Sequence, residues 1–396
     1  MRGLLAVLLI ALACLAAAPA NAQAQIDELS WEYQFGDHIL FKARLQSDQA
    51  VESAFLFAGE KGGTRTFVEA AKVKALGEGI YELEYDFDLA EHPLRAFTPV
   101  EFRFEVKPVG GGVTSSAIEQ LEYTDNRFAW QQLEEKPFRV YWYEGGLAFG
   151  QEVLDVAQAS LKKAQNMAIV ATPELVRIYV YPNSADMQET LSLASRDGTA
   201  GHADPDLGVV VVSLPSGPEQ QLLTEQRLPH ELMHVLLYQL SGPGYASLPA
   251  WLNEGLASAA ELFPNPEYQV LLERAYQNGG LLPISSLCKF FPNDAPSALL
   301  AYAESQSFVS YLFNAFGRNG LQSLIAQYAD QLDCEKGAAG ALGVSLEELE
   351  IGWRAERFGE NLTRQAILKL LPWLVLLVAA LIAPLALVFA WLRRRR

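Results

Sequence analysis

Short runs in which apolar and polar residues alternate fill the chain from about residue 30 to residue 124. One such run places Tyr81, Leu83, Tyr85 and Phe87 on one side of an extended segment, which is the period of a half-buried β-strand. Turns rich in glycine separate these runs at short intervals. The spacing predicts an all-β sandwich of immunoglobulin type over residues 27–125.

The pattern changes near Pro137. A strand-like run, a run with helical period and a second strand-like run follow one another within residues 138–181. Four consecutive valines at 209–212 predict a buried strand, and from Glu219 onward most segments have a helical period. Together these segments predict a second domain of α+β class over residues 137–360.

Apolar segments at both ends of the chain predict a secretory signal and a membrane anchor. An apolar stretch followed by the small residues at 20–22 predicts a signal peptide over 1–22. Residues 370–392 carry no charge and, at about 1.5 Å per residue, could cross a hydrocarbon core about 30 Å thick. Arginines fill 393–396, and positive residues stay in the cytoplasm. We therefore expect a single-pass protein of the cell membrane, with one transmembrane helix, a cytoplasmic tail at 393–396 and an extracytoplasmic bulk.

The charge of the chain narrows the choice of partners. With 30 basic and 47 acidic residues, the formal charge is −17, which argues against nucleic acid because phosphate binding needs a basic face. Two cysteines, Cys288 and Cys334, follow the predicted signal peptide. An extracytoplasmic location permits them to pair, but two free buried thiols are an equal alternative.

The strongest chemical signal is the segment from His230 to His234, His-Glu-Leu-Met-His, which matches the motif H-E-x-x-H. On a helix, positions i and i+4 lie about 5–6 Å apart, so both imidazoles can reach one metal ion. Glu231 can then point to the open coordination position and accept a proton from water there.

A catalytic zinc needs a third protein ligand. A metzincin would supply it from a histidine at position 240, with a glycine at 237, but this chain has leucine at both positions. Glu254, twenty positions after His234, is the remaining source on a following helix. We expect one Zn²⁺ per chain, held by His230, His234 and Glu254.

His-Glu-Leu-Met-His followed by Asn253-Glu254-Gly255 resembles the peptidase MA-like metallohydrolases, a group of gluzincin zinc metallopeptidases. The resemblance extends over about 138–358 and includes Gly201-His202-Ala203, the segment 302–308 and the segment 346–353. It implies a zincin-like fold, a membrane anchor, and hydrolysis of a peptide or protein substrate with Glu231 as the general base.

Two residues depart from the gluzincin pattern. Pro229 directly precedes His230 and would kink a continuous helix, whereas a helix that begins at Pro229 would accommodate it. Serine stands at position 258, where thermolysin-like relatives often carry an aspartate that orients a histidine. We therefore expect another residue to orient the histidines.

Several alternatives stay open at this point. Tyr302 and Tyr311, on a helix expected over 299–316, are both candidate donors to the oxyanion, and both also suit a core position. His202 is either an exposed loop residue or part of a substrate cleft. The alternative function is a catalytically degenerate, peptidase-like surface protein for binding or adhesion. A zinc-dependent hydrolase of another bond and the oligomeric state are left open as well.

Overall fold

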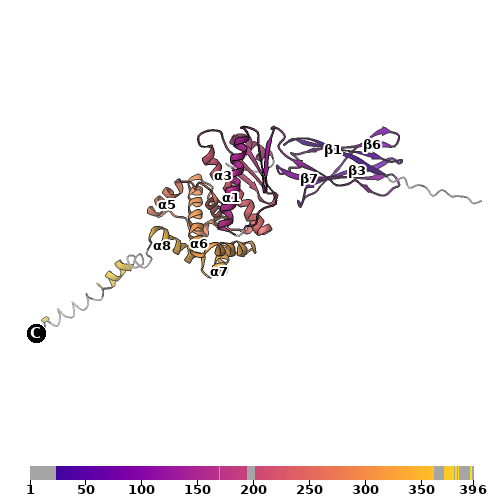
Figure 1. Cartoon of the computed structure of the whole chain (residues 1–396). Coiled ribbons are helices and arrows are strands. Elements are labelled where there is room, and N and C mark those ends of the chain that lie inside the picture. The colour runs from indigo at the N-terminus through magenta and orange to yellow at the C-terminus, as the bar shows by residue number, and fades with distance from the viewer. Residues whose placement is uncertain are drawn as a thin grey trace, which may run out of the picture. The chain divides into compact units, whose positions relative to one another are not determined.

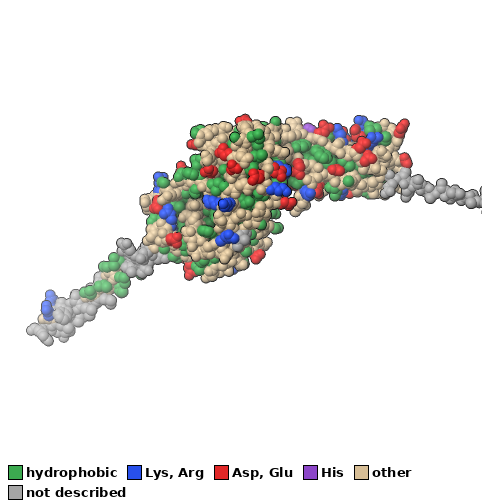
Figure 2. Space-filling model, viewed as in Figure 1, with side chains coloured by type: hydrophobic (Ala, Val, Ile, Leu, Met, Phe, Trp, Pro, Cys, Tyr) green, Lys and Arg blue, Asp and Glu red, His purple; other side chains and the backbone are tan. Residues whose placement is uncertain are grey.

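The computed structural model describes residues 24–168, 170–193, 201–360, 370–378, 380, 382, 393 and 394. The predicted signal peptide at 1–22 lies outside these residues. The chain divides into two compact units (Figure 1), and the first holds residues 24–128 and 190–193 of the described part. The second holds 129–168, 170–189 and those from 201 onward. Acidic and basic side chains are interspersed over the visible faces of both units (Figure 2), as expected for surfaces in contact with water.

Two antiparallel sheets form the first unit. One has the order β1-β2-β6-β5, with β1 (Gln25–Gln34), β2 (His38–Gln46), β6 (Ile80–Asp88) and β5 (Lys72–Gly77). The other has the order β4-β3-β7-β8, and β9 also pairs with β7; it contains β4 (Phe67–Ala70), β3 (Val51–Glu60), β7 (Thr98–Pro108), β8 (Thr114–Ser115) and β9 (Glu119–Tyr123).

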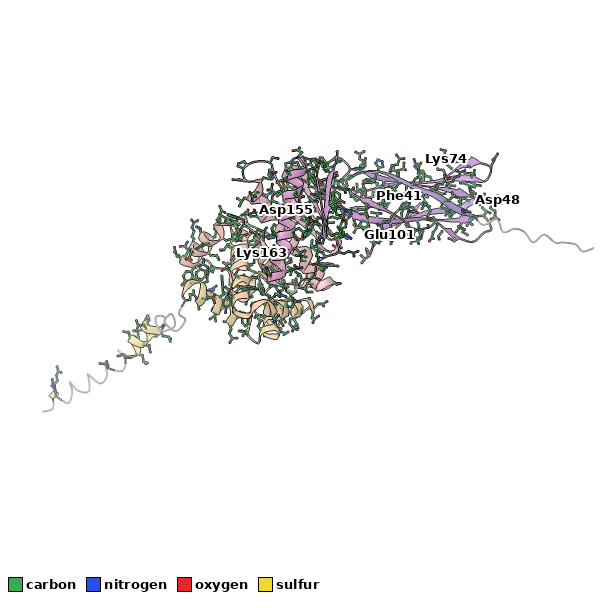
Figure 3. The ribbon with its side chains drawn as sticks, in the orientation of Figure 1. Phe41, Asp48, Lys74, Glu101, Asp155 and Lys163 are labelled. Atoms are coloured by element: carbon green, nitrogen blue, oxygen red, sulfur yellow. A yellow bond between two sulfur atoms is a disulfide. The ribbon has the colours of Figure 1, made fainter. Side chains whose placement is uncertain are left out.

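Side chains along β2 and β7 alternate between buried and less buried positions, which is the period that a pleated strand imposes. Phe41 on β2 lies against Phe102 on β7, with ring centroids 4.6 Å apart. The two sheets therefore pack face to face around an aromatic core, within which Phe41 is labelled in Figure 3.

A five-stranded mixed sheet organises the second unit. Its order is β10-β11-β12-β14-β13, with β10 (Gln131–Glu135), β11 (Phe138–Trp142), β12 (Val176–Tyr181), β14 (Val209–Ser213) and β13 (Gly201–Asp204). The three inner strands are parallel, and β10 and β13 pair antiparallel at the two edges. The four valines fall on β14 and are buried on both faces, which is typical of a strand inside a covered sheet.

Helices complete the second unit, and α1 (Leu147–Met167) and α3 (Gln220–Ser241) contribute to one hydrophobic core with Val140, Ile178 and Val210 of the sheet. The other helices that the structure describes up to residue 360 are α2 (Ser184–Leu193), whose residues 190–193 belong to the first unit, α4 (Ala250–Ala260), α5 (Glu267–Gln277), α6 (Ala295–Ala329), α7 (Cys334–Leu342) and α8 (Leu346–Phe358). Three short 3-10 helices are η1 (Pro205–Leu207), η2 (Gly242–Ser247) and η3 (Ile284–Leu287).

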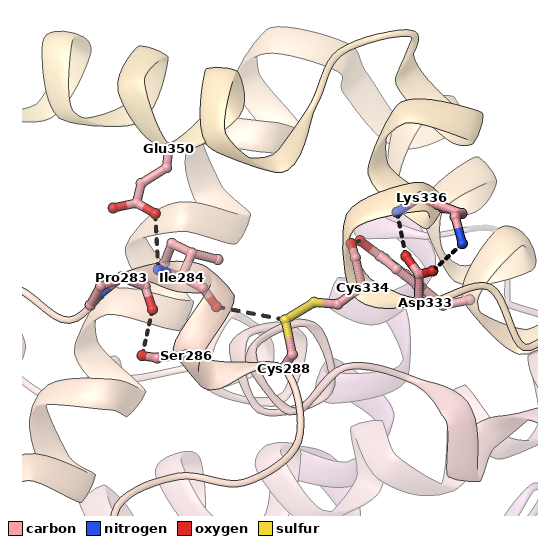
Figure 4. The surroundings of a disulfide bond; sticks show 9 residues. Pro283, Ile284, Ser286, Cys288, Asp333, Cys334, Lys336 and Glu350 are labelled. Carbon is pink, nitrogen blue, oxygen red and sulfur yellow. Dashed lines mark hydrogen bonds and ion pairs between the residues drawn. A yellow bond between two sulfur atoms is a disulfide. The ribbon is translucent and has the colours of Figure 1, made fainter.

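Cys288 and Cys334 form a disulfide, which resolves the alternative that the sequence left open (Figure 4). Cys288 follows η3, and Cys334 is the first residue of α7. The backbone carbonyl of Cys288 also accepts a hydrogen bond from the N–H of Ala250, the first residue of α4, at 3.0 Å. The disulfide-bonded segment is thus in direct contact with the start of α4.

The prediction of one transmembrane helix over 370–392 is wrong. In the part of the chain that the structure describes, no helix has both the length and the apolar character required to cross a membrane. Residues 379, 381 and 383–392 lie outside the described residues. The predicted single-pass membrane localisation depended on that helix, so the same finding contradicts it.

Candidate metal centre

The helix α3 carries the H-E-x-x-H segment and is oriented by its apolar face. Leu228, Leu232 and Leu236 recur at helical spacing and are fully buried in the core of the second unit. His230 and His234 therefore leave the opposite side of the helix together, with ring centroids 5.2 Å apart.

Pro229 lies inside α3, because the helix begins at Gln220. The interpretation that the helix begins at Pro229 is therefore wrong. Proline has no N–H to donate to the carbonyl four residues earlier, that of Glu225. The backbone N–H groups of Leu262 and Phe263 donate to this carbonyl instead, at 2.9 and 3.3 Å. Other donors thus satisfy the carbonyl that the proline leaves free, and the helix continues.

Glu254 on α4 meets the two histidines. Its Oε2 lies 3.4 Å from Nε2 of His230 and 3.8 Å from Nε2 of His234. One ligand atom from each of the three residues lies within 4.8 Å of the other two. Two imidazole nitrogens and one carboxylate oxygen are the donor set of a catalytic zinc that keeps an open position. The structure thus brings together the three residues predicted as ligands, and their donor set fits Zn²⁺.

Each histidine has a second partner at its other ring nitrogen. Nδ1 of His230 is 3.4 Å from Oε1 of Glu261. Nδ1 of His234 is 3.1 Å from Oδ1 of Asn253 and 3.2 Å from the hydroxyl of Tyr245. Such contacts hold the imidazole rings and leave Nε2 directed at the metal position.

Glu261 supplies the acidic partner for a histidine that the serine at position 258 does not supply. It lies seven residues after Glu254, so two helical turns place both on the same side, and it directly follows α4. The sequence reasoning missed Glu261 because it looked for an acid four residues after the ligand; the seven-residue spacing was the available signal. Tyr245, on the 3-10 helix η2, had no such signal.

The charges around the site favour a cation. Burial by itself would lower the pKa of His230, but hydrogen bonds to Glu254 and Glu261 and the charge of Glu231 raise this pKa to about 10. Burial by itself would raise the pKa of Glu254, yet the neighbouring His234 and His230 hold it below its ordinary value. Several carboxylates thus converge on the imidazoles.

A cavity of about 320 Å³ opens beside the site, and His230, Glu231, Tyr302 and Gly201 are among its lining residues. Gly201 is the first residue of the edge strand β13. A Cβ atom at this glycine would lie only 2.5 Å from Oε1 of Glu231, so the strand runs directly against the carboxylate. Glu231 is therefore held between its own helix and the sheet edge.

The two candidate oxyanion donors are in different places. Tyr302 lines the cavity, and its ring centroid is 6.1 Å from that of His230. Tyr311 points at α8, where a Cβ at Gly352 would be 2.3 Å from its hydroxyl. His202 pairs with Val211, so it projects from the face of the sheet opposite to Val210 and the core it shares with α3. Of these three residues, Tyr302 is the one beside the metal centre.

The sequence profile of the Peptidase MA superfamily matches residues 156–358, slightly more than half of the 396-residue chain. The chain belongs to this superfamily, which confirms the resemblance drawn from its motifs. The matched region contains all three candidate ligands and Glu231. No curated protein matches the chain.

Solved structures resemble this chain only weakly. OgpA from Akkermansia muciniphila aligns at 12% identity with a TM-score of 0.22, covering 27% of this chain and 29% of that chain. This chain thus spans less than a third of the length of OgpA. An M1 zinc metallopeptidase from Deinococcus radiodurans aligns at 13% identity and a TM-score of 0.36, covering 81% of this chain and 90% of that chain. An aminopeptidase N family protein from Idiomarina loihiensis aligns at 10% identity and a TM-score of 0.35, covering 87% and 75%. Alignments this loose do not establish a common fold, so the family assignment depends on the sequence match.

Proposed function

We propose that this protein is a zinc-dependent metallopeptidase that holds one Zn²⁺ with His230, His234 and Glu254 and uses Glu231 as the general base. The observation that carries the proposal is the convergence of three ligand atoms within 4.8 Å of one another, beside a cavity that Glu231 also lines. When bound, zinc supplies the Lewis acidity that polarises a peptide carbonyl and activates water.

Glu231 suits a proton-transfer role. It is adjacent in sequence to His230 and lies in the same cavity, where its carboxylate can accept a proton from the attacking water. The same carboxyl can then donate that proton to the nitrogen of the departing amine. Its contact with Gly201 limits the space around it and restricts its movement.

The edge strand β13 supports a peptide as the substrate. It is the last strand of its sheet order and begins at Gly201, in contact with Glu231. An extended peptide can add to such an edge through backbone hydrogen bonds, which would bring a scissile bond to the cavity. A peptide or protein substrate therefore fits both the shape and the chemistry of the site.

Replacement of the base tests the mechanism. Glu231→Gln should keep one zinc per chain, measured by plasma mass spectrometry, while cleavage of a quenched-fluorescent peptide library falls at least ~10²-fold, because the amide cannot accept the proton. Glu254→Ala should lose stoichiometric zinc because two ligands remain. Full cleavage by a pure preparation of Glu231→Gln would contradict the mechanism, and a folded wild-type chain without zinc would favour the catalytically degenerate binding protein instead.

A further inference from the structure

The proline inside α3 changes which groups its helix can bind. Because residue 229 has no N–H, the carbonyl of Glu225 remains available after the helix has formed. The N–H groups of Leu262 and Phe263 occupy this carbonyl, at 2.9 and 3.3 Å. The segment that follows α4 is therefore attached to α3 at a residue five positions before His230.

A second contact fixes the same segment from another side. Lys163 on α1, labelled in Figure 3, donates from its ammonium group to the backbone carbonyl of Glu261. Glu261 is itself buried, with 6% of its surface exposed. Lys163 of α1 and the Glu225 carbonyl of α3 thus both bind the peptide group that joins Glu261 to Leu262, and they hold it from two elements.

The carboxylate of Glu261 is directed at the ligand histidine. Its Oε1 lies 3.4 Å from Nδ1 of His230, while Nε2 of the same ring lies 3.4 Å from Oε2 of Glu254. An acceptor at Nδ1 selects the tautomer whose Nε2 lone pair is free, and it fixes the orientation of the ring. His234 obtains the same support from Asn253 and Tyr245, so Glu261 serves His230 alone.

We propose that Glu261 is the positioning residue for His230, and that Pro229 creates its position by leaving the Glu225 carbonyl free to bind the segment after α4. The proposal rests on the zinc site proposed above. It predicts that a proline, although unfavourable for a helix, improves metal binding.

Variants at Glu261 test the positioning role. Glu261→Ala should weaken zinc binding about 10–100-fold in competition with a chromophoric chelator. Glu261→Gln, which keeps an acceptor oxygen of nearly the same shape, should lose less than about tenfold. The visible spectrum of the cobalt-substituted protein should change in Glu261→Ala, because that spectrum reports ligand geometry. Glu267→Ala, which removes an exposed glutamate from the first turn of α5, is the matched control and should change neither quantity.

Pro229→Ala tests the placement itself. Alanine restores an N–H that competes with Leu262 and Phe263 for the Glu225 carbonyl. Amide hydrogen exchange at residues 262 and 263 should then accelerate in the metal-free protein, and zinc binding should weaken. The matched control is Pro296→Ala, an exposed proline in the first turn of α6, where no intrahelical carbonyl is left free.

The outcomes separate this inference from the proposed function. If wild-type protein binds no zinc, the zinc site fails and the positioning role fails with it. If wild-type protein binds zinc but Glu261→Ala binds it within twofold as tightly, the positioning role alone is overturned. Unchanged exchange at 262 and 263 in Pro229→Ala would overturn the role of the proline, whatever the result with zinc.

Discussion

At the scale of single residues, Glu304 on α6 is a carboxyl group without exposed surface. Its Oε1 accepts the backbone N–H of Leu282 at 3.0 Å, while its Oε2 has no hydrogen-bond partner among the described residues. Burial raises the pKa of Glu304, the Leu282 N–H and Arg354 oppose the rise, and Glu350 adds to it, so that the pKa reaches about 8. The folded chain therefore holds a proton here that the unfolded chain releases at about pH 4.5.

This proton makes stability depend on pH. Since the folded state binds more protons between about pH 4.5 and pH 8, its free energy of unfolding should fall as pH rises through that window, by roughly 1–5 kcal/mol. Glu304→Gln mimics the protonated form and should lack the decline. Urea denaturation at pH 5 and pH 9 checks this: the variant should equal wild type at pH 5 and exceed it at pH 9. Parallel pH profiles for the two proteins would contradict the prediction.

We propose Tyr302 as the donor to the oxyanion, because it lines the cavity beside His230. Burial, followed by the charges of Glu254 and Glu231, raises the pKa of Tyr302, so its hydroxyl stays protonated and can donate. Tyr302→Phe should lower kcat about 10²–10³-fold with KM and zinc content unchanged, measured on a peptide that wild type cleaves. Tyr311→Phe is the control, because its hydroxyl faces α8. Equal losses in the two variants would contradict the assignment.

Residue spacing could predict which ligand candidates meet, but it could not predict what surrounds them. His230 and His234 follow from helical period alone, whereas Glu254 follows from its spacing together with the resemblance to the peptidase MA-like metallohydrolases. The partner of His230 depends on how the segment after α4 leaves its helix, which in turn depends on a backbone carbonyl of α3. Pro229 marks the Glu225 carbonyl as free, but the sequence does not show that the segment after α4 reaches that carbonyl, so the contact could not be predicted.

At the scale of elements, the close approach of α4 and α6 determines where Glu254 lies. Gly255, the next residue, has no side chain, and a Cβ at this position would lie 2.6 Å from the backbone oxygen of Ser305 on α6 and 2.7 Å from Val309. Helix packing therefore explains why a glycine follows Glu254.

Gly255→Ala should move α4 away from α6. Although alanine favours a helix by about 1 kcal/mol, the clash with backbone should dominate and lower the free energy of unfolding by roughly 1–3 kcal/mol. Zinc affinity should fall as well, because Glu254 shifts with the helix. Urea denaturation of the metal-free protein and chelator competition measure the two effects. Gly280→Ala, whose nearest neighbour is 3.8 Å away, should show neither; a stabilised Gly255→Ala protein with full zinc affinity would refute the packing argument.

The helical periods in the sequence predicted which segments form helices better than they predicted where those helices begin and end. The helix expected over 299–316 lies within α6, which continues to Ala329 across a kink at Gly317, where φ is 67°. Glycine tolerates this conformation, so two helical runs join as one bent element. In α3 the sequence left open whether Pro229 kinks the helix or starts it, and the structure places this proline in the interior of the helix.

At the scale of the whole molecule, each unit has its own hydrophobic core. The core that surrounds α3 runs from Phe138 to Trp353 and includes no residue of the first unit's sheets. The sheet of the second unit already includes β10, before the change of pattern near Pro137. Alternating apolar and polar residues could not predict β10, because this edge strand is polar and mostly exposed.

Separate cores predict separate responses to zinc. All proposed ligands lie in the second unit, and a ligand stabilises only the fold that binds it, by about 2.7 kcal/mol at a concentration 100 times its Kd. Calorimetry of the intact chain should therefore show two transitions. Zinc should raise one of them by roughly 5–10 °C and leave the other in place. Glu254→Ala, measured in the same way, should show no shift in either transition. A single transition that moves as a whole with zinc would mean that the two units unfold as one cooperative body, because binding energy would then be shared with a sandwich that contributes no ligand.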